Sequence, residues 1–161
     1  MARLARTYTL SAVRPASFDE MGAPLLLWID DFAPGLMLYK AIFERNGFRV
    51  ITASSGAEGV RLASLYNPDV VVTDYEMPGM DGEAVAVALR ALCPATPVIM
   101  YSGSTLVPLR VRRSVSAFCD KAGSRDQLLA TIHRVMTKKH TRPLQPSPFP
   151  AASNDGHRTV D

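Results

Sequence analysis

Five short apolar segments in the middle of the chain limit its fold more than any other feature. Stretches with helical periodicity separate them, and they are residues 25–29, 48–52, 70–73, 97–101 and 115–119. The run Val70-Val71-Val72 has no polar alternation, which is typical of a strand buried on both faces. Such strands alternating with helices predict a parallel sheet covered by helices on each side.

The intervening stretches carry helix signals. Helices are expected at about residues 34–46, 55–66 and 82–92, with a short one within 105–113 and a last one from Ser124. Ser55 with Glu58, and Ser124 with Gln127, have the spacing of N-terminal capping boxes. Because parallel crossovers are right-handed, few topologies remain. The sequence therefore predicts an α/β fold, a doubly wound (βα)5 sheet with strand order 2-1-3-4-5.

Composition supports one globular domain with extensions. Of the 161 residues, 47% are hydrophobic and 20% are charged, enough for a core without disulfides or metals. We expect a disordered extension over residues 1–22, a folded domain over 23–138 and a Pro-rich flexible tail over 139–161. No apolar run approaches the roughly 18–20 residues that span a bilayer, so no membrane segment is expected.

Charge and cysteine content bear on binding to nucleic acid and on the cellular compartment. The net charge of +3 comes from the two ends, because residues 23–137 are balanced, and direct binding to nucleic acid is not expected. Cys93 and Cys119 lie in or beside apolar runs and form no CxxC pair. They are interpreted as small core residues in a reducing compartment, which favours a cytoplasmic location. The arginines 110, 112 and 113 are interpreted as a solvated face.

Polar residues follow the predicted strands. They are Asp30 and Asp31 after the first, Asp74 after the third, Ser102 after the fourth, and Asp120 and Lys121 after the fifth. In a doubly wound sheet, ligands bind outside the carboxyl ends of the strands. Three carboxylates meeting there would repel one another. Lys121 and a hard divalent cation, best Mg²⁺, would compensate them.

Four motifs at these strand ends resemble the receiver domain of two-component response regulators. They are Trp28-Ile29-Asp30-Asp31-Phe32, the stretch from Val72 to Gly82 (VTDYEMPGMDG), Ile99-Met100-Tyr101-Ser102-Gly103, and Ala117-Phe118-Cys119-Asp120-Lys121. The resemblance covers about residues 24–137 and implies the flavodoxin-like receiver fold.

The resemblance implies a role for each matching residue. Asp74 would accept a phosphoryl group, and Asp30, Asp31, Asp74 and the main-chain carbonyl of Glu76 would hold Mg²⁺. Lys121 would pair with one phosphoryl oxygen and Ser102 would hydrogen-bond another. Phe118 stands where the family has a switch aromatic.

The resemblance also implies partners. A sensor histidine kinase or a histidine phosphotransfer protein would donate the phosphoryl group, and a downstream protein would be the target. Because only 24 residues follow residue 137, we expect a stand-alone receiver, either monomeric or dimerising on phosphorylation.

Two alternatives stay open. Ala122 replaces the proline that usually follows the lysine, and a cis bond there is not expected. Three features motivate the first alternative: this replacement, the presence of Glu76 near the acceptor, and a short fourth helix. The alternative is a pseudo-receiver that acts as a constitutive interaction module. An enzyme on a similar sheet is the other alternative. A flavin site there would need a phosphate loop where Asp30 and Asp31 stand, and an aspartyl-nucleophile phosphatase would need two aspartates two residues apart.

Overall fold

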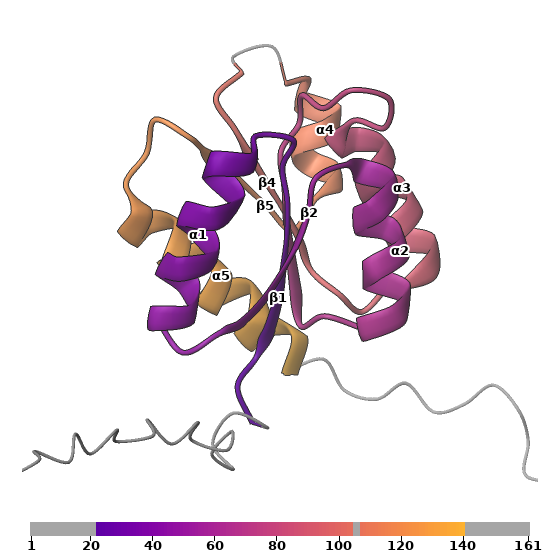
Figure 1. Cartoon of the computed structure of the whole chain (residues 1–161). Helices are drawn as coiled ribbons and strands as arrows, with labels where there is room; N and C mark the ends of the chain where they lie inside the picture. Colours follow the sequence, from indigo (N-terminus) through magenta and orange to yellow (C-terminus); the bar gives the residue numbers. More distant parts are fainter. Residues whose placement is uncertain (1–21, 105–106, 141–161) are drawn as a thin grey trace, which may run out of the picture.

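The computed structural model describes residues 22–104 and 107–140 and contains one five-stranded parallel sheet in the order β2-β1-β3-β4-β5 (Figure 1). The strands are β1 (Leu25–Ile29), β2 (Arg49–Ala53), β3 (Val70–Thr73), β4 (Val98–Ser102) and β5 (Ala117–Asp120). The helices are α1 (Ala33–Arg45), α2 (Gly56–Tyr66), α3 (Gly82–Leu92), α4 (Leu109–Ser114) and α5 (Arg125–His140). The predicted fold class and strand order are confirmed.

The register places the strand ends at one edge of the sheet. Trp28 of β1 pairs with Thr52 of β2 on one side and with Val72 of β3 on the other. Because all pairs are parallel, the residues that follow β1, β3, β4 and β5 share the same edge, which lies at the top of Figure 1.

Helices α1 and α5 cover one face of the sheet and α2, α3 and α4 the other (Figure 1). Alternate side chains of each strand enter different cores. Leu26 and Trp28 face α1 and α5, whereas Leu27 and Ile29 face α2 and α3. This two-sided burial explains why the strands carry continuous apolar sequence rather than alternation.

An aromatic cluster fills the core on the α1 side. The Trp28 ring stacks on Tyr39 at a centroid distance of 4.3 Å and meets the edge of Tyr101 at 5.5 Å. The Tyr39 and Tyr101 hydroxyls lie 2.9 Å apart, and this hydrogen bond gives the buried Tyr101 hydroxyl a partner. The cluster ties α1 to the strand that leads into Ser102.

Helix starts follow the predicted capping signals. The Ser55 hydroxyl accepts from the Glu58 N–H at 3.3 Å, and Ser124 and Gln127 exchange hydrogen bonds before α5. Asp81 caps α3 by accepting from the Ala84 N–H at 2.8 Å. Helix α4 is six residues long, which confirms the short helix expected there.

Some boundaries differ from the sequence expectations. Strands β2, β4 and β5 begin one or two residues later than predicted, because parallel pairing rather than apolar content sets the strand limits. Ser102 and Asp120 thus belong to their strands. Helix α5 continues to His140, so residues 139 and 140, expected to begin the flexible tail, belong to the helix. Most of the two extensions expected over 1–22 and 139–161 lies outside the described residues.

No helix in the described part of the chain is long and apolar enough to cross a membrane. Cys93 and Cys119 are free, partly buried thiols, consistent with the packing role assigned to them.

Candidate functional site

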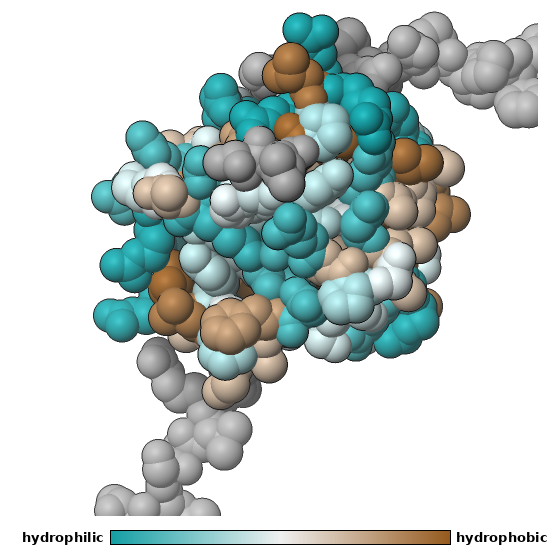
Figure 2. All heavy atoms as spheres, turned by 90° about the horizontal axis from the view of Figure 1, so that it is seen from above, coloured by the Kyte–Doolittle hydropathy of each residue, from teal (hydrophilic) through white to brown (hydrophobic). Residues whose placement is uncertain are grey.

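Three aspartates converge at the carboxyl edge of the sheet. Asp30 and Asp31 follow β1 and Asp74 follows β3, and one carboxylate oxygen of each lies within 4.8 Å of the others. Asp30 is buried, Asp74 is partly buried and Asp31 is exposed. Figure 2 looks onto this edge from above and shows hydrophilic residues gathered over its centre, with apolar residues toward the rim. Of the three aspartates, Asp31 is the one most accessible to solvent.

Lys121 lies among the carboxylates. Its Nζ donates to Asp74 Oδ2 at 2.8 Å and to Asp30 Oδ2 at 3.0 Å. Burial lowers the pKa of the ammonium, but the hydrogen bonds and charges of the two aspartates outweigh burial and raise the pKa above its ordinary value. Lys121 is thus a fixed positive charge at neutral pH.

Backbone contacts place Lys121 without a proline after it. The Lys121 N–H donates to the Ser102 carbonyl at 3.1 Å, and the Asp120 carboxylate accepts from the Ala122 N–H at 2.8 Å. The peptide bond to Ala122 is trans, as expected for alanine. Asp120 is not one of the three clustered aspartates, and its hydrogen bond makes it the turn residue that ends β5.

The loop after β3 orients the Asp74 carboxylate through a backbone hydrogen bond. Asp74 Oδ1 accepts from the Tyr75 N–H at 2.6 Å, and the Gly82 N–H donates to the Tyr75 carbonyl at 2.9 Å. A Cβ at position 82 would collide with the Asp74 carbonyl oxygen and the Met100 sulfur. Gly79 has a φ of +76°, so its glycine serves the turn. Both glycines of the sequence motif thus have a structural reason.

The other predicted site residues surround this centre at different depths. Ser102 is buried at the end of β4, and its Oγ accepts from the Ser104 N–H at 3.1 Å. Glu76 is exposed, and its carboxylate is not part of the three-aspartate cluster. Phe118 is partly buried on β5, paired with Met100 of β4. The structure therefore brings Asp30, Asp31, Asp74 and Lys121 together directly.

Arginines on α4 make contacts that the sequence interpretation missed. Arg110 forms an ion pair with Glu83 of α3 at 3.1 Å, and the Arg112 guanidinium lies 4.1 Å from the centroid of the Phe118 ring. Arg90 of α3 donates to the Ser114 carbonyl at the end of α4. Arg110 and Arg113 are exposed, as the interpretation of a solvated face expects, and the partly buried Arg112 is the exception. No spacing rule links residues 112 and 118, so the sequence carried no signal for their contact.

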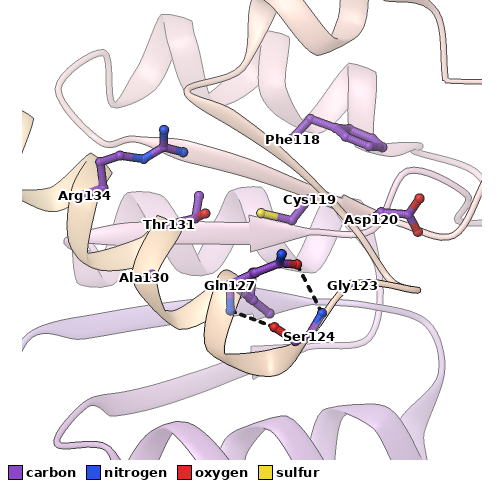
Figure 3. A pocket seen from close by; sticks show the side chains of 10 residues that line it. Phe118, Cys119, Asp120, Gly123, Ser124, Gln127, Ala130, Thr131 and Arg134 are labelled. Carbon is purple, nitrogen blue, oxygen red and sulfur yellow. Dashed lines mark hydrogen bonds between the residues drawn. The ribbon is translucent and has the colours of Figure 1, made fainter.

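A groove of about 480 Å³ runs between β5 and α5 (Figure 3). Cys119, Thr131 and Arg134 line it, and the mutual capping of Ser124 and Gln127 closes one end. None of the three clustered aspartates lines this groove.

The donor set fits a hard divalent cation. Three carboxylates and one ammonium leave two formal negative charges, and all the donors of the cluster are oxygens. Few protein ligands, oxygen donors and an open side are the conditions that suit Mg²⁺, which keeps several of its waters. Asp30, Asp31 and Asp74 are the side chains that would hold the ion.

The comparisons with known proteins agree with this geometry. The family model of the response regulator receiver domain matches residues 26–133. The cell cycle transcriptional regulator CtrA of Caulobacter vibrioides is 29% identical over 116 residues, covering 70% of this chain and 50% of that protein. The transcriptional regulatory protein PrrA of Mycobacterium tuberculosis is 38% identical over 89 residues, covering 55% of this chain and 38% of that protein.

A solved receiver domain protein from Clostridium thermocellum superposes with a TM-score of 0.68 at 27% identity, covering 73% of this chain and 97% of that one. The chain spans half or less of the length of these two curated relatives. The family model covers more than half of this chain, so the chain belongs to the family of response regulator receiver domains.

Proposed function

We propose that this domain is a phosphorylation-dependent signalling switch in which Asp74 accepts a phosphoryl group from the phosphohistidine of a sensor histidine kinase or a histidine phosphotransfer protein. The observation that carries the proposal is the Asp74 carboxylate, held by the Tyr75 N–H on one oxygen and by Lys121 on the other. This nucleophile is oriented and charge-compensated, which is most of what phosphoryl transfer requires.

The transfer is a displacement at phosphorus, in which one bond forms as another breaks. A carboxylate oxygen of Asp74 forms the new P–O bond as the P–N bond to histidine breaks, and the imidazole leaves with its electron pair. Bound Mg²⁺ supplies neutralisation of the charge on the transferring oxygens. Lys121, already 2.8 Å from Asp74 Oδ2, then pairs with a phosphoryl oxygen in place of the carboxylate.

The Ser102 hydroxyl and the Phe118 ring are proposed to transmit the change. Ser102 ends the strand next to β3 and its hydroxyl is buried, so it can donate to a phosphoryl oxygen after a small shift of its loop. Phe118 lies on the neighbouring strand, and a shift of that loop alters the space around its ring. The altered surface would bind a downstream protein.

The test is the intact mass of the full chain after incubation with phosphoramidate, with and without Mg²⁺. One added phosphoryl group is expected, dependent on Mg²⁺ and absent from Asp74→Asn. Asp120→Asn is the matched control, because Asp120 ends β5, which β4 separates from β3, and lies outside the acidic cluster, while asparagine keeps an oxygen that can accept from the Ala122 N–H. This variant should still gain the mass.

A constitutive interaction module on the same fold is the alternative, motivated by Ala122, Glu76 and the short α4. Folded wild-type protein that gains no mass, even when sampled within seconds, would overturn the phosphorylation proposal in favour of this alternative. Mass gain in Asp74→Asn equal to wild type would overturn the assignment of the acceptor.

A further inference from the structure

Arg112 makes a direct contact with the ring of the candidate switch residue. Its guanidinium carbon lies 4.1 Å from the centroid of Phe118, which is well within the distance of a cation–π interaction. Figure 3 shows the ring on the opposite side of β5 from Gln127 and Thr131, which is the side where α4 lies in Figure 1. The contact therefore links β5 to α4 across the upper edge of the sheet.

The same guanidinium is tied to the segment between β4 and α4. Arg112 Nε donates to the Val107 carbonyl at 3.3 Å, and Val107 itself is buried. Val107 packs with Met100 and Val111 in a small core against which Phe118 also packs. One side chain thus contacts both the switch ring and the segment that leads away from Ser102.

We propose that Arg112 is a positioning residue that holds Phe118 in its present place and thereby opposes the switch. This inference rests on the proposed function, in which a phosphoryl group on Asp74 draws Ser102 toward itself. Movement of the segment after Ser102 displaces the Val107 carbonyl. The Arg112 guanidinium then loses its hydrogen bond to this carbonyl and its contact with the Phe118 ring. Phosphorylation therefore has to break the contact between Arg112 and Phe118.

Thermodynamic linkage predicts the direction in which loss of Arg112 changes the binding of a phosphoryl mimic. A contact made in one arrangement and lost in the other biases the equilibrium by its own free energy, and its removal favours the second arrangement. Exposed cation–π contacts of about 0.5–1 kcal/mol correspond to about a two- to fivefold change in an equilibrium constant. Loss of Arg112 should tighten binding of a phosphoryl mimic to Asp74 by that factor.

The experiment titrates the full chain with beryllofluoride at saturating Mg²⁺ and follows the bound species by ¹⁹F NMR. Arg112→Met keeps an unbranched apolar stem, although a shorter side chain, and removes the cation. Arg113→Met is the matched control. Arg113 is an exposed neighbour on the same helix, and its substitution removes the same charge. We expect about two- to fivefold tighter binding for Arg112→Met and no such change for Arg113→Met.

A double-mutant cycle isolates the contact itself. In a Phe118→Leu background the ring is gone, so Arg112→Met should no longer tighten binding. Equal or weaker binding by Arg112→Met than by wild type would overturn the inference. Equal tightening in both backgrounds would also overturn it, since the effect would then come from charge or folding. Wild-type protein that binds no beryllofluoride would instead overturn the proposed function, and this inference with it.

Discussion

The Nζ of Lys121 lies 2.8 Å from Oδ2 of Asp74, so the candidate nucleophile and its counter-charge are already in contact within the folded chain. The lysine comes from the edge strand and the aspartate from the central strand, with β4 between them. The ammonium also lies 5.9 Å from the centroid of the Tyr101 ring on β4. The charge balance of the site thus depends on one extended side chain.

Replacing Lys121 by Met should destabilise the fold by about 1–2 kcal/mol at neutral pH without Mg²⁺, because the charge-assisted hydrogen bonds to Asp30 and Asp74 are lost. The pKa of Lys121 is raised on folding, so its stabilising effect is complete below the ordinary value of 10.5 and is lost as pH rises through the raised value. Urea denaturation should give a constant difference between wild type and variant from pH 7 to 9. A difference that disappears within that range would contradict the ion-pair account.

Asp31 and Asp30 should respond differently to neutralisation, because only Asp30 is bonded to Lys121. Asp31→Asn should weaken Mg²⁺ binding at least about tenfold while leaving stability within about 0.5 kcal/mol, as expected for an exposed position. Asp30→Asn should weaken Mg²⁺ binding and also lower stability. Calorimetric titration with MgCl₂ and thermal unfolding measure the two effects. Unchanged Mg²⁺ affinity in Asp31→Asn would remove Asp31 from the proposed ligand set.

Glu76 is the exposed acid two residues beyond the proposed acceptor, so its charge would repel an anionic donor approaching Asp74. Glu76→Asn should raise the rate of phosphorylation by phosphoramidate about twofold at low salt, and less at high salt. Glu76→Asp is the matched variant, because it has the shape of asparagine but keeps the charge. Equal phosphorylation rates and equal acyl-phosphate lifetimes for wild type and both variants would show that Glu76 has no electrostatic role.

Two glycines in the loop after β3 make a matched pair for stability. Gly82→Ala should cost about 2–3 kcal/mol, because the added methyl meets the Asp74 carbonyl, and should also slow phosphorylation by moving that residue. Gly79→Ala should cost about 1 kcal/mol, since only its positive φ of 76° is unfavourable and its surroundings are open. Urea denaturation of both variants gives the comparison. An equal cost would mean that the loop relaxes away from Asp74.

The sequence predicted the sheet and the acidic cluster because their determinants are local. Apolar runs such as Val70-Val71-Val72 mark strands, and right-handed crossovers then fix which strand ends are neighbours. Asp30 and Asp74 could be placed together on that basis alone. Strand limits were less predictable, because pairing with a neighbour and not composition decides whether Ser102 or Asp120 belongs to a strand.

Contacts between distant side chains were beyond the reach of the sequence. The contact of Arg112 with Phe118 and the hydroxyl pair of Tyr39 and Tyr101 join elements whose separation follows no periodicity. The turn formed by the Asp120 carboxylate with the Ala122 N–H was equally hidden, because the sequence does not show which backbone N–H an aspartate at a strand end will bond. Such contacts depend on the packing of long side chains, which pattern rules do not describe.

The hydrogen bond between Lys121 and Asp30 joins residues 91 positions apart. A chain still emerging from the ribosome has its acidic residues well before it has the lysine that balances them. Until β5 docks against β4, the three carboxylates lack this charge, and a kinase that met the nascent chain would find no assembled acceptor. If Asp74 is the acceptor that we propose, phosphorylation would therefore require a completely folded domain, and a copy lacking β5 would stay unphosphorylated.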